Sequence, residues 1–183
     1  IATANAMELS GAKPVLVDVN TNNLTISVDA IKKAITSKTK AIVPVHVTGR
    51  GADMAAILEL TKKHDLSVVE DAAEALTSKQ GNQYLGTFGD FGCFSFSANK
   101  TISTGQGGMI VTNNDEIFAK LRPLKDQGRP TRGTGGDDLH NTVGYNFRMT
   151  DLQAGLGLGQ LTHLQERTAR MKRNYELYAK NLK

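Results

Sequence analysis

Residues 41–71, AIVPVHVTGRGADMAAILELTKKHDLSVVED, contain the pattern that decides the fold. The apolar run at 41–47 predicts a buried strand, and the run at 66–70 predicts a second one. Between them, residues 53–64 have apolar positions at helical spacing. Asp53 stands in the first turn of this helix and basic residues stand in the last, as the helix dipole favours. A strand, a helix and another strand in this order indicate parallel strands joined by a helix.

The same alternation continues outward from this unit in both directions. Further strands are predicted at 14–19, 91–96 and 108–112, and further helices at 1–10, 28–35 and 115–124. Thr150 is predicted to cap a long terminal helix whose apolar positions reach Leu177, after a polar, glycine-rich loop at 126–142. We therefore predict an α/β domain of three layers (α/β/α), with helices on both faces of a mainly parallel sheet.

Length and composition exclude several classes of protein. The 183 residues are enough for one sizeable core,. No apolar run approaches the roughly 20 residues that span a bilayer, and no basic segment opens the chain as in a signal peptide. Cys93 is the single cysteine, which excludes an internal disulfide framework and fits a reducing cytoplasm,. The net charge of +4 is modest and its basic residues are dispersed, so we expect neither nucleic-acid nor membrane partners,.

Two polar residues follow predicted strands at the same edge of the sheet. Asp71 comes directly after the run 66–70, and Lys100 lies four residues past the run 91–96. Ligands of parallel sheets bind beyond the carboxyl ends of the strands, so both side chains are expected to face one crevice. A lysine there can form a Schiff base with a carbonyl compound. A carboxylate that binds the pyridine nitrogen completes the pairing that pyridoxal phosphate uses.

Donors for a cofactor phosphate are available beside Lys100. Strand alternation places Ser95 and Ser97 on one face, and the glycines at 105, 107 and 108 permit close approach of the backbone. Each of these patterns is common without any ligand, because strand-end aspartates often cap helices and single lysines are usually solvated. From these residues alone, a cofactor site and a purely structural interpretation both remain open.

Four motifs in order resemble the sugar aminotransferases of the DegT/StrS type. They are VVEDAAEAL (68–76), GTFGDFGCFSFSANKTISTGQGGMIVT (86–112), LKDQG (124–128) and GYNFRMTDLQAGLGLGQL (144–161). The stretches 2–19 and 39–54 fit as well, so the resemblance covers essentially the whole chain. It implies a pyridoxal-phosphate enzyme with the aspartate aminotransferase fold. It further implies that 1–183 is the large, cofactor-binding domain, truncated at both ends, with 151–183 as a helical segment leading toward a small domain.

The resemblance also implies a role for individual residues. Lys100 would hold the cofactor covalently and act as the catalytic residue, Asp71 would bind the pyridine nitrogen, and Ser95 would contact the phosphate. Asn146 would reach the cofactor phosphate of a neighbouring subunit, so a homodimer with shared active sites is implied. Glu74 stands where many members have His or Gln near the cofactor ring. Glutamate at this position resembles the perosamine-synthase branch, and no metal is implied.

For the reaction, the resemblance implies transfer of an amino group from L-glutamate to C4 of a nucleotide-linked 4-keto-6-deoxy sugar, in the cytoplasm. One alternative is a pyridoxamine-phosphate-dependent sugar dehydratase of the same family. Those enzymes replace the lysine by histidine, so Lys100 disfavours it. The other alternative is a non-catalytic sensor, or a fragment that retains only the fold.

Three further positions have structural interpretations beside functional ones. His46 is expected to order the edge of the sheet rather than to transfer protons. Arg148 either meets a substrate phosphate or forms an ion pair near the start of the terminal helix. The glycines at 155, 157 and 159 are expected to allow close helix packing.

Overall fold

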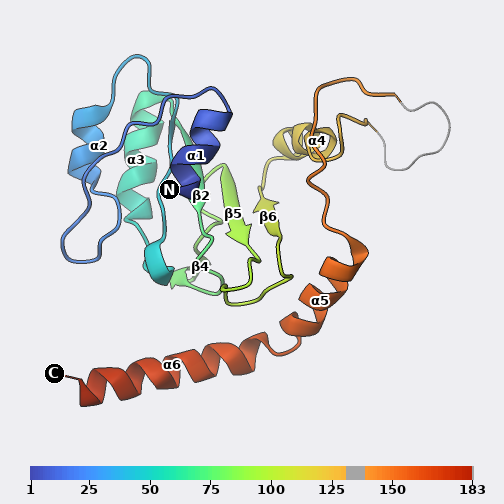
Figure 1. Cartoon of the computed structure of the whole chain (residues 1–183). Helices are drawn as coiled ribbons and strands as arrows, with labels where there is room; N and C mark the ends of the chain where they lie inside the picture. The colour runs from blue at the N-terminus through green and yellow to red at the C-terminus, as the bar shows by residue number, and fades with distance from the viewer. Residues whose placement is uncertain (131–138, 183) are drawn as a thin grey trace.

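The computed structural model describes residues 1–130 and 139–182 (Figure 1). Its helices are α1 (Ala2–Leu9), α2 (Val28–Ala34), α3 (Met54–His64), α4 (Asp115–Leu124), α5 (Asp151–Leu161) and α6 (Leu164–Asn181), with a 3-10 turn η1 (Val47–Gly49). Its strands are β1 (Ala41–Ile42), β2 (Ser67–Asp71), β3 (Lys79–Gln80), β4 (Gln83–Tyr84), β5 (Phe91–Ser95) and β6 (Gly108–Val111).

The main sheet has the strand order β1-β2-β5-β6. β1 and β5 both pair with β2 in parallel, whereas β6 runs antiparallel to β5. The prediction of a mainly parallel sheet in an α/β fold is therefore confirmed. The short hairpin of β3 and β4 was not predicted, because its two-residue strands carry no apolar alternation.

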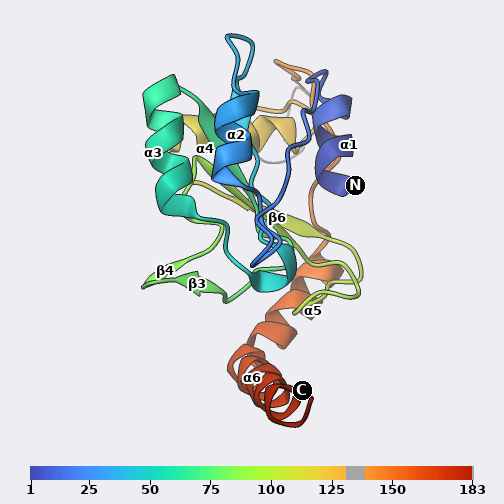
Figure 2. The same ribbon diagram turned by 90° about the vertical axis from the view of Figure 1, so that its left-hand side faces the viewer.

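Strand alternation assigns the residues of β2 to two different faces. Val68 is buried in the core cluster with α2 and α3, which cover one face of the sheet. Asp71, three residues further on, points to the opposite face, where its carboxylate meets Thr3 of α1,. Figure 2 shows α2 and α3 beside each other and α1 apart from them. Helices thus lie on both faces, as expected for the three-layer arrangement.

The predicted strand at 41–47 is shorter in the structure. Pro44 has no N–H to donate to a neighbouring strand, and the ladder is interrupted there,. The pairing continues locally, because the Asp71 N–H donates to Pro44 O (2.9 Å) and the His46 N–H donates to Asp71 O (3.0 Å). The chain then turns away at Thr48, whose φ is 52°.

The predicted strand at 14–19 is wrong. A strand needs a partner for its backbone groups, and in the described part of the chain this run has only one such link. Val19 forms an isolated bridge with Ile26, in which Asp18 O accepts from the Ser27 N–H (3.0 Å). Val17 packs against the core, but Leu16 is 85% exposed. Apolar composition does not show where a pairing partner is, and that is why the prediction fails here.

The terminal helix is broken into two. Thr150 caps α5 with a full capping box, as predicted, but α5 ends at Leu161 and α6 begins at Leu164. The Thr162 hydroxyl donates to Gly159 O (2.7 Å) at the break. Of the three glycines, only Gly157 is packed closely, since a Cβ there would lie 3.0 Å from Thr104; the other two face open space.

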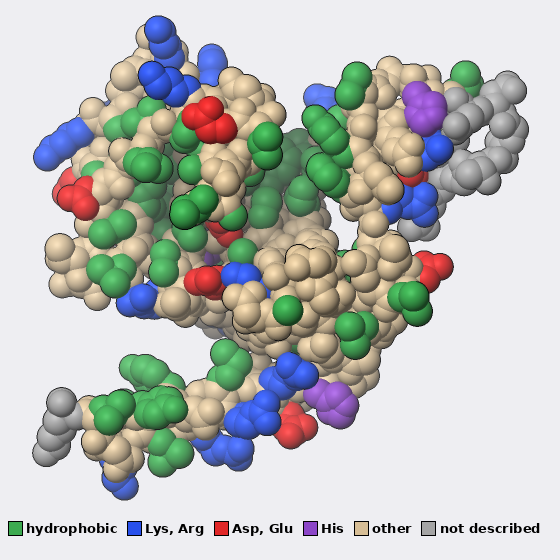
Figure 3. Space-filling model, viewed as in Figure 1, with side chains coloured by type: hydrophobic (Ala, Val, Ile, Leu, Met, Phe, Trp, Pro, Cys, Tyr) green, Lys and Arg blue, Asp and Glu red, His purple; other side chains and the backbone are tan. Residues whose placement is uncertain are grey.

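In Figures 1 and 2, α6 lies apart from the sheet, beyond α5. Its exposed hydrophobic side chains gather toward the C-terminal end (Figure 3); they are Met171, Tyr175, Leu177, Tyr178 and Leu182. None of the helices in the described residues has the length and apolar character needed to cross a membrane. Of the predicted loop at 126–142, residues 131–138 lie outside the described residues, and the flanking parts contain no helix or regular strand.

Candidate active site

Asp71 ends β2, at the carboxyl edge of the parallel strands. Its two carboxylate oxygens each accept one hydrogen bond. Thr3 Oγ1 donates to Oδ2 at 2.6 Å, and the Ala73 N–H donates to Oδ1 at 3.1 Å. A carboxylate offers about four lone-pair positions, so this arrangement fixes its orientation and leaves room for a further donor.

Lys100 forms an ion pair with Glu74, which follows Asp71 closely in the chain. Lys100 Nζ lies 3.3 Å from Glu74 Oε1, and the other oxygen of Glu74 accepts from the Thr48 N–H at 2.8 Å. The Lys100 side chain is 18% exposed and that of Glu74 is 43% exposed. The Thr48 N–H, and after it Lys100, lower the pKa of Glu74. The structure therefore brings Lys100 and Glu74 together, and Glu74 lies three residues beyond Asp71.

A strained turn presents the Thr48 N–H to Glu74. Thr48 has a left-handed backbone, which threonine rarely adopts, and Gly49 follows with φ 83°,. A side chain at Gly49 would lie 2.9 Å from Ser78 Oγ, so glycine is required there by space as well as by conformation,. Such strain persists only where surrounding contacts hold it, and the bond to Glu74 is one of these contacts.

A buried network lies directly behind the site. The Ala52 N–H donates to His46 Nδ1 (3.2 Å), so the ring carries its proton on Nε2 and donates to Glu70 Oε2 at 2.9 Å,. Both side chains are fully buried. The interpretation of His46 as an ordering residue agrees with these contacts.

Glu70 accepts three more hydrogen bonds, from the N–H groups of Gly86 (2.7 Å), Phe88 (2.6 Å) and Gly89 (2.7 Å). Burial raises the pKa of Glu70, but the hydrogen bonds from His46 and the three N–H groups outweigh it, so that the pKa lies below its usual value. The loop 86–89 can come this close because Gly92 has no side chain; a Cβ there would collide with Gly86 O.

Ser95 and Cys93 lie on the same face of the sheet as Asp71. The register pairs Asp71 with Cys93, and Ser95 is two residues further along β5,. Ser95 Oγ accepts from the Ser97 N–H at 3.3 Å and keeps its own proton available for another acceptor. Burial, and then the negative charge of Asp71, raise the pKa of Cys93.

Asn146 lies in a different neighbourhood. It forms an isolated bridge with Asp126, and Arg148 binds the carboxylate of Asp126 with both contacts at 3.2 Å. Within the described residues, no hydrogen bond links Asn146 to Asp71 or Lys100. Of the two interpretations of Arg148, ion pairing is therefore the one that this structure contains.

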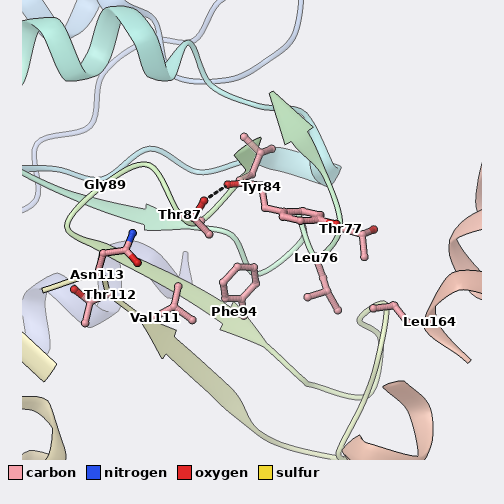
Figure 4. A pocket seen from close by; sticks show the side chains of 12 residues that line it. Leu76, Thr77, Tyr84, Thr87, Gly89, Phe94, Val111, Thr112, Asn113 and Leu164 are labelled. Carbon is pink, nitrogen blue, oxygen red and sulfur yellow. Dashed lines mark hydrogen bonds between the residues drawn. The ribbon is translucent and has the colours of Figure 1, made fainter. Parts of the chain in front are cut away.

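A separate cavity of about 360 Å³ lies on the opposite face of the sheet (Figure 4). Phe94 and Val111 line it, on the face away from Ser95, together with Leu76 and Leu164. Its walls are mainly apolar and hold no lysine or carboxylate. It does not contribute to the candidate site.

Sequence reasoning missed Thr3, Thr48 and the role of Glu70. Thr3 and Thr48 act through single hydrogen bonds to residues far along the chain, and no local pattern signals such contacts. Glu70 left one signal that could have been used: an acidic residue inside an apolar run is seldom buried unless it is paired.

The whole chain, residues 1–183, matches the model of the DegT/DnrJ/EryC1/StrS aminotransferase family. The chain belongs to this family. Its members are pyridoxal-phosphate-dependent enzymes, so the expected cofactor is confirmed for the family.

Two curated relatives and one solved structure illustrate the similarity. The chain is 42% identical over 182 residues to a GDP-perosamine synthase of Escherichia coli O157:H7, covering 100% of this chain and 49% of the relative. It is 40% identical over 183 residues to a UDP-N-acetyl-3-dehydro-alpha-D-glucosamine 3-aminotransferase of Acidithiobacillus ferrooxidans, covering 100% and 48%. An aminotransferase of Psychrobacter cryohalolentis has 35% identity and a TM-score of 0.88, covering 98% and 49%. The chain thus spans about half the length of the curated relatives it matches.

The residues present fit pyridoxal phosphate. One face of the sheet edge carries a carboxylate with free lone pairs, Asp71, and a serine hydroxyl, Ser95. The same edge carries the amine of Lys100, which is partly shielded from solvent. These are the groups that a protonated pyridine nitrogen, a phosphate and an aldehyde need.

Proposed function

We propose that this chain carries the cofactor site of a pyridoxal-phosphate-dependent aminotransferase that acts on a nucleotide-linked sugar. The observation that supports it most directly is the placement of Lys100 and Asp71. Both lie at the carboxyl edge of the parallel strands, and both are held by contacts within the chain,. Bound pyridoxal phosphate supplies an electron-withdrawing ring that stabilises negative charge at the substrate carbon.

Each residue has a separate task in this proposal. Lys100 would hold the cofactor through its amine and would serve as the group that carries a proton during the reaction. Asp71 would accept a charge-assisted hydrogen bond from the protonated pyridine nitrogen and so favour its protonated form. Ser95 donates to the phosphate. Glu74 accepts a hydrogen bond from the Lys100 ammonium at 3.3 Å and so orients the amine.

For the substrate we propose C4 of a nucleotide-linked 4-keto-6-deoxy sugar, with L-glutamate as the amino donor. The 42% identity to a GDP-perosamine synthase supports this choice, together with the glutamate at position 74. The similarity to a UDP-sugar 3-aminotransferase is almost as high, so the position of the keto group is the first property to test.

We further propose a homodimer in the cytoplasm, with Asn146 serving the neighbouring subunit's site. The support is that Asn146 is exposed, with its backbone fixed through Asp126, and that no hydrogen bond links it to Asp71 or Lys100 within the described residues. An exposed amide is available to a neighbouring subunit. Residues 1–183 would form the large domain, with 151–183 leading toward a small domain.

The test begins with the purified chain and pyridoxal phosphate. Absorption in the near-visible region is followed during titration, the adduct is reduced with borohydride, and the labelled peptide is mapped by mass spectrometry. We expect the label on Lys100 and none at that position in Lys100→Ala. Labelling scattered over surface lysines would refute the proposed site.

The reaction is then assayed with ¹⁵N-labelled L-glutamate and nucleotide-linked 3-keto or 4-keto sugars. Transfer of ¹⁵N to the 4-keto sugar supports the proposal, and transfer only to the 3-keto sugar corrects the position. Loss of a hydroxyl from the sugar without gain of nitrogen would instead indicate a dehydratase, which Lys100 disfavours.

A further inference from the structure

We propose that Thr3 is a positioning residue for Asp71, whose hydroxyl fixes the carboxylate in the orientation that meets the pyridine nitrogen. This inference rests on the proposed function. It concerns a residue in the first turn of α1, 68 positions away from the carboxylate it contacts.

The contact is short and specific. Thr3 Oγ1 donates to Asp71 Oδ2 at 2.6 Å, and the Ala73 N–H holds the other oxygen at 3.1 Å. Two donors on different oxygens prevent the carboxylate from rotating unless one bond breaks. Without Thr3, the remaining bond to Ala73 would allow the group to turn about its side-chain torsion, which is broad and roughly two-fold for aspartate.

The bond does not lie within a wider packing interface of α1. α1 contains no buried residue, and Ile1 and Leu9 at its two ends are exposed. Among the hydrogen bonds between described residues, Thr3–Asp71 is the one side-chain bond that joins α1 to the sheet. The hydroxyl therefore acts on the strand-end carboxylate and is not part of a wider packing interface.

The Asp71 carboxylate has two hydrogen-bond donors as its polar contacts within the described residues. Within residues 1–130 and 139–182, no lysine or arginine forms an ion pair with it. Its neighbour across the register is Cys93, whose pKa is raised by burial and then by the charge of Asp71. The Thr3 hydroxyl and the Ala73 N–H are therefore the groups that hold the carboxylate in place.

Three substitutions in the full chain test the inference. Thr3→Val removes the hydroxyl at nearly constant shape, and Thr3→Ser keeps the hydroxyl. Thr162→Val is the matched control, because it removes a threonine hydroxyl bond far from Asp71. Should Thr3→Val lose the circular dichroism of the fold, Thr3→Ala removes the same hydroxyl with a better helix former.

The first measurement needs no cofactor. Amide hydrogen exchange is followed at Ala73, whose N–H depends on the orientation of Asp71, and at Leu60 in the core as a reference. Thr3→Val is expected to raise exchange at Ala73 about five-fold, the effect of one lost hydrogen bond, and to leave Leu60 unchanged. Thr3→Ser and Thr162→Val are expected to match the unsubstituted chain.

The second measurement is pyridoxal-phosphate affinity, together with the ¹⁵N chemical shift of the labelled pyridine nitrogen. Thr3→Val is expected to weaken binding about five-fold and to move the shift toward that of an unprotonated nitrogen, while Thr3→Ser restores both. A purely structural role of Thr3 would leave the nitrogen signal unchanged.

The outcomes separate this inference from the proposed function. Unchanged Ala73 exchange in Thr3→Val overturns the inference, even where Lys100 takes up the cofactor normally. Faster exchange with an unchanged nitrogen signal in a cofactor-loaded chain overturns it too. If Lys100 takes up no cofactor, the proposed function is refuted. If Ala73 exchange is nevertheless faster in Thr3→Val and not in the two other variants, the fixing of Asp71 by Thr3 is still supported.

Discussion

Replacing Glu70 with glutamine is expected to lower the free energy of unfolding by about 2–6 kcal/mol. Glu70 is fully buried and accepts four hydrogen bonds, two on each carboxylate oxygen. Glutamine has nearly the same shape but presents an NH₂ group in place of one oxygen. The substitution therefore leaves the packing intact and changes only the hydrogen bonding and the charge.

Neither orientation of the glutamine amide satisfies the site. With NH₂ on the Oε1 side, the N–H groups of Phe88 and Gly89 face another donor. With NH₂ on the Oε2 side, Gly86 loses its acceptor and His46 would have to move its proton to Nδ1, where the Ala52 N–H already donates. Two buried donors are orphaned in either case, at about 1–3 kcal/mol each.

Glu74→Gln is the matched control, because it makes the same chemical change at a side chain that is 43% exposed to solvent. The ion pair with Lys100 and the bond from Thr48 can be replaced by water, so a change of about 0–1 kcal/mol is expected. Both variants are unfolded with urea at pH 7, and unfolding is followed by circular dichroism. Their free energies of unfolding are compared only if their m-values are equal.

The pH dependence gives a second measurement. Because the pKa of Glu70 is lowered in the folded chain, its contribution is fully present above the unfolded pKa of about 4.3 and is lost as the pH falls through the folded value,. The difference in stability between the unsubstituted chain and Glu70→Gln should therefore shrink as the pH falls below about 4. A Glu70→Gln variant within 1 kcal/mol of the Glu74→Gln control at pH 7 would refute the buried network.

Three further results are expected. Lys100→Ala should abolish the borohydride-stable adduct while changing the free energy of unfolding by no more than about 1 kcal/mol, since its ion pair is partly solvated. Alkylation of Cys93 at pH 8 should be slower than that of a free thiol and should accelerate in Asp71→Asn, although burial keeps it below the free rate. The pKa of Glu74, measured by ¹³C NMR, should rise in Lys100→Ala but stay below its usual value, because the Thr48 N–H is the larger cause.

The parts of the fold that local pattern determines were predictable from the sequence. The helices α2, α3 and α5 begin where the pattern predicts them, because each start is fixed by a side-chain cap within four residues, at Ser27, Asp53 and Thr150. Asp53 is the cap of α3 and does not lie in its first turn, and the helix after Thr150 ends earlier than predicted, at Leu161. The strands that became β2, β5 and β6 were also found. The run at 14–19 has the same apolar composition as these, and it fails because a strand requires a partner that composition cannot supply.

The site was predictable to the extent that its residues follow strand ends. Lys100 and Asp71 could be selected by this rule and by the resemblance to a family. Thr3 and Thr48 could not, because each reaches the site through one hydrogen bond across a long stretch of chain. Backbone strain at Thr48 is also invisible in the sequence, since nothing marks this threonine as left-handed.

The adjacent residues Glu70 and Asp71 show how the two-residue period of a strand sends one carboxylate into the core and the next to the opposite face. Consecutive residues of a strand point to opposite faces, so one carboxylate of the pair must face the core and the other the site. The sequence predicts that the two side chains point to opposite faces of the sheet, but it does not show which of them faces the core. His46 and the loop 86–89 decide it, because they provide the four donors that a buried carboxylate needs. Shifting the register of β2 by one residue so that Asp71 entered that network would put Ala72 at the position of Asp71, so the network that buries Glu70 also fixes the direction of Asp71,.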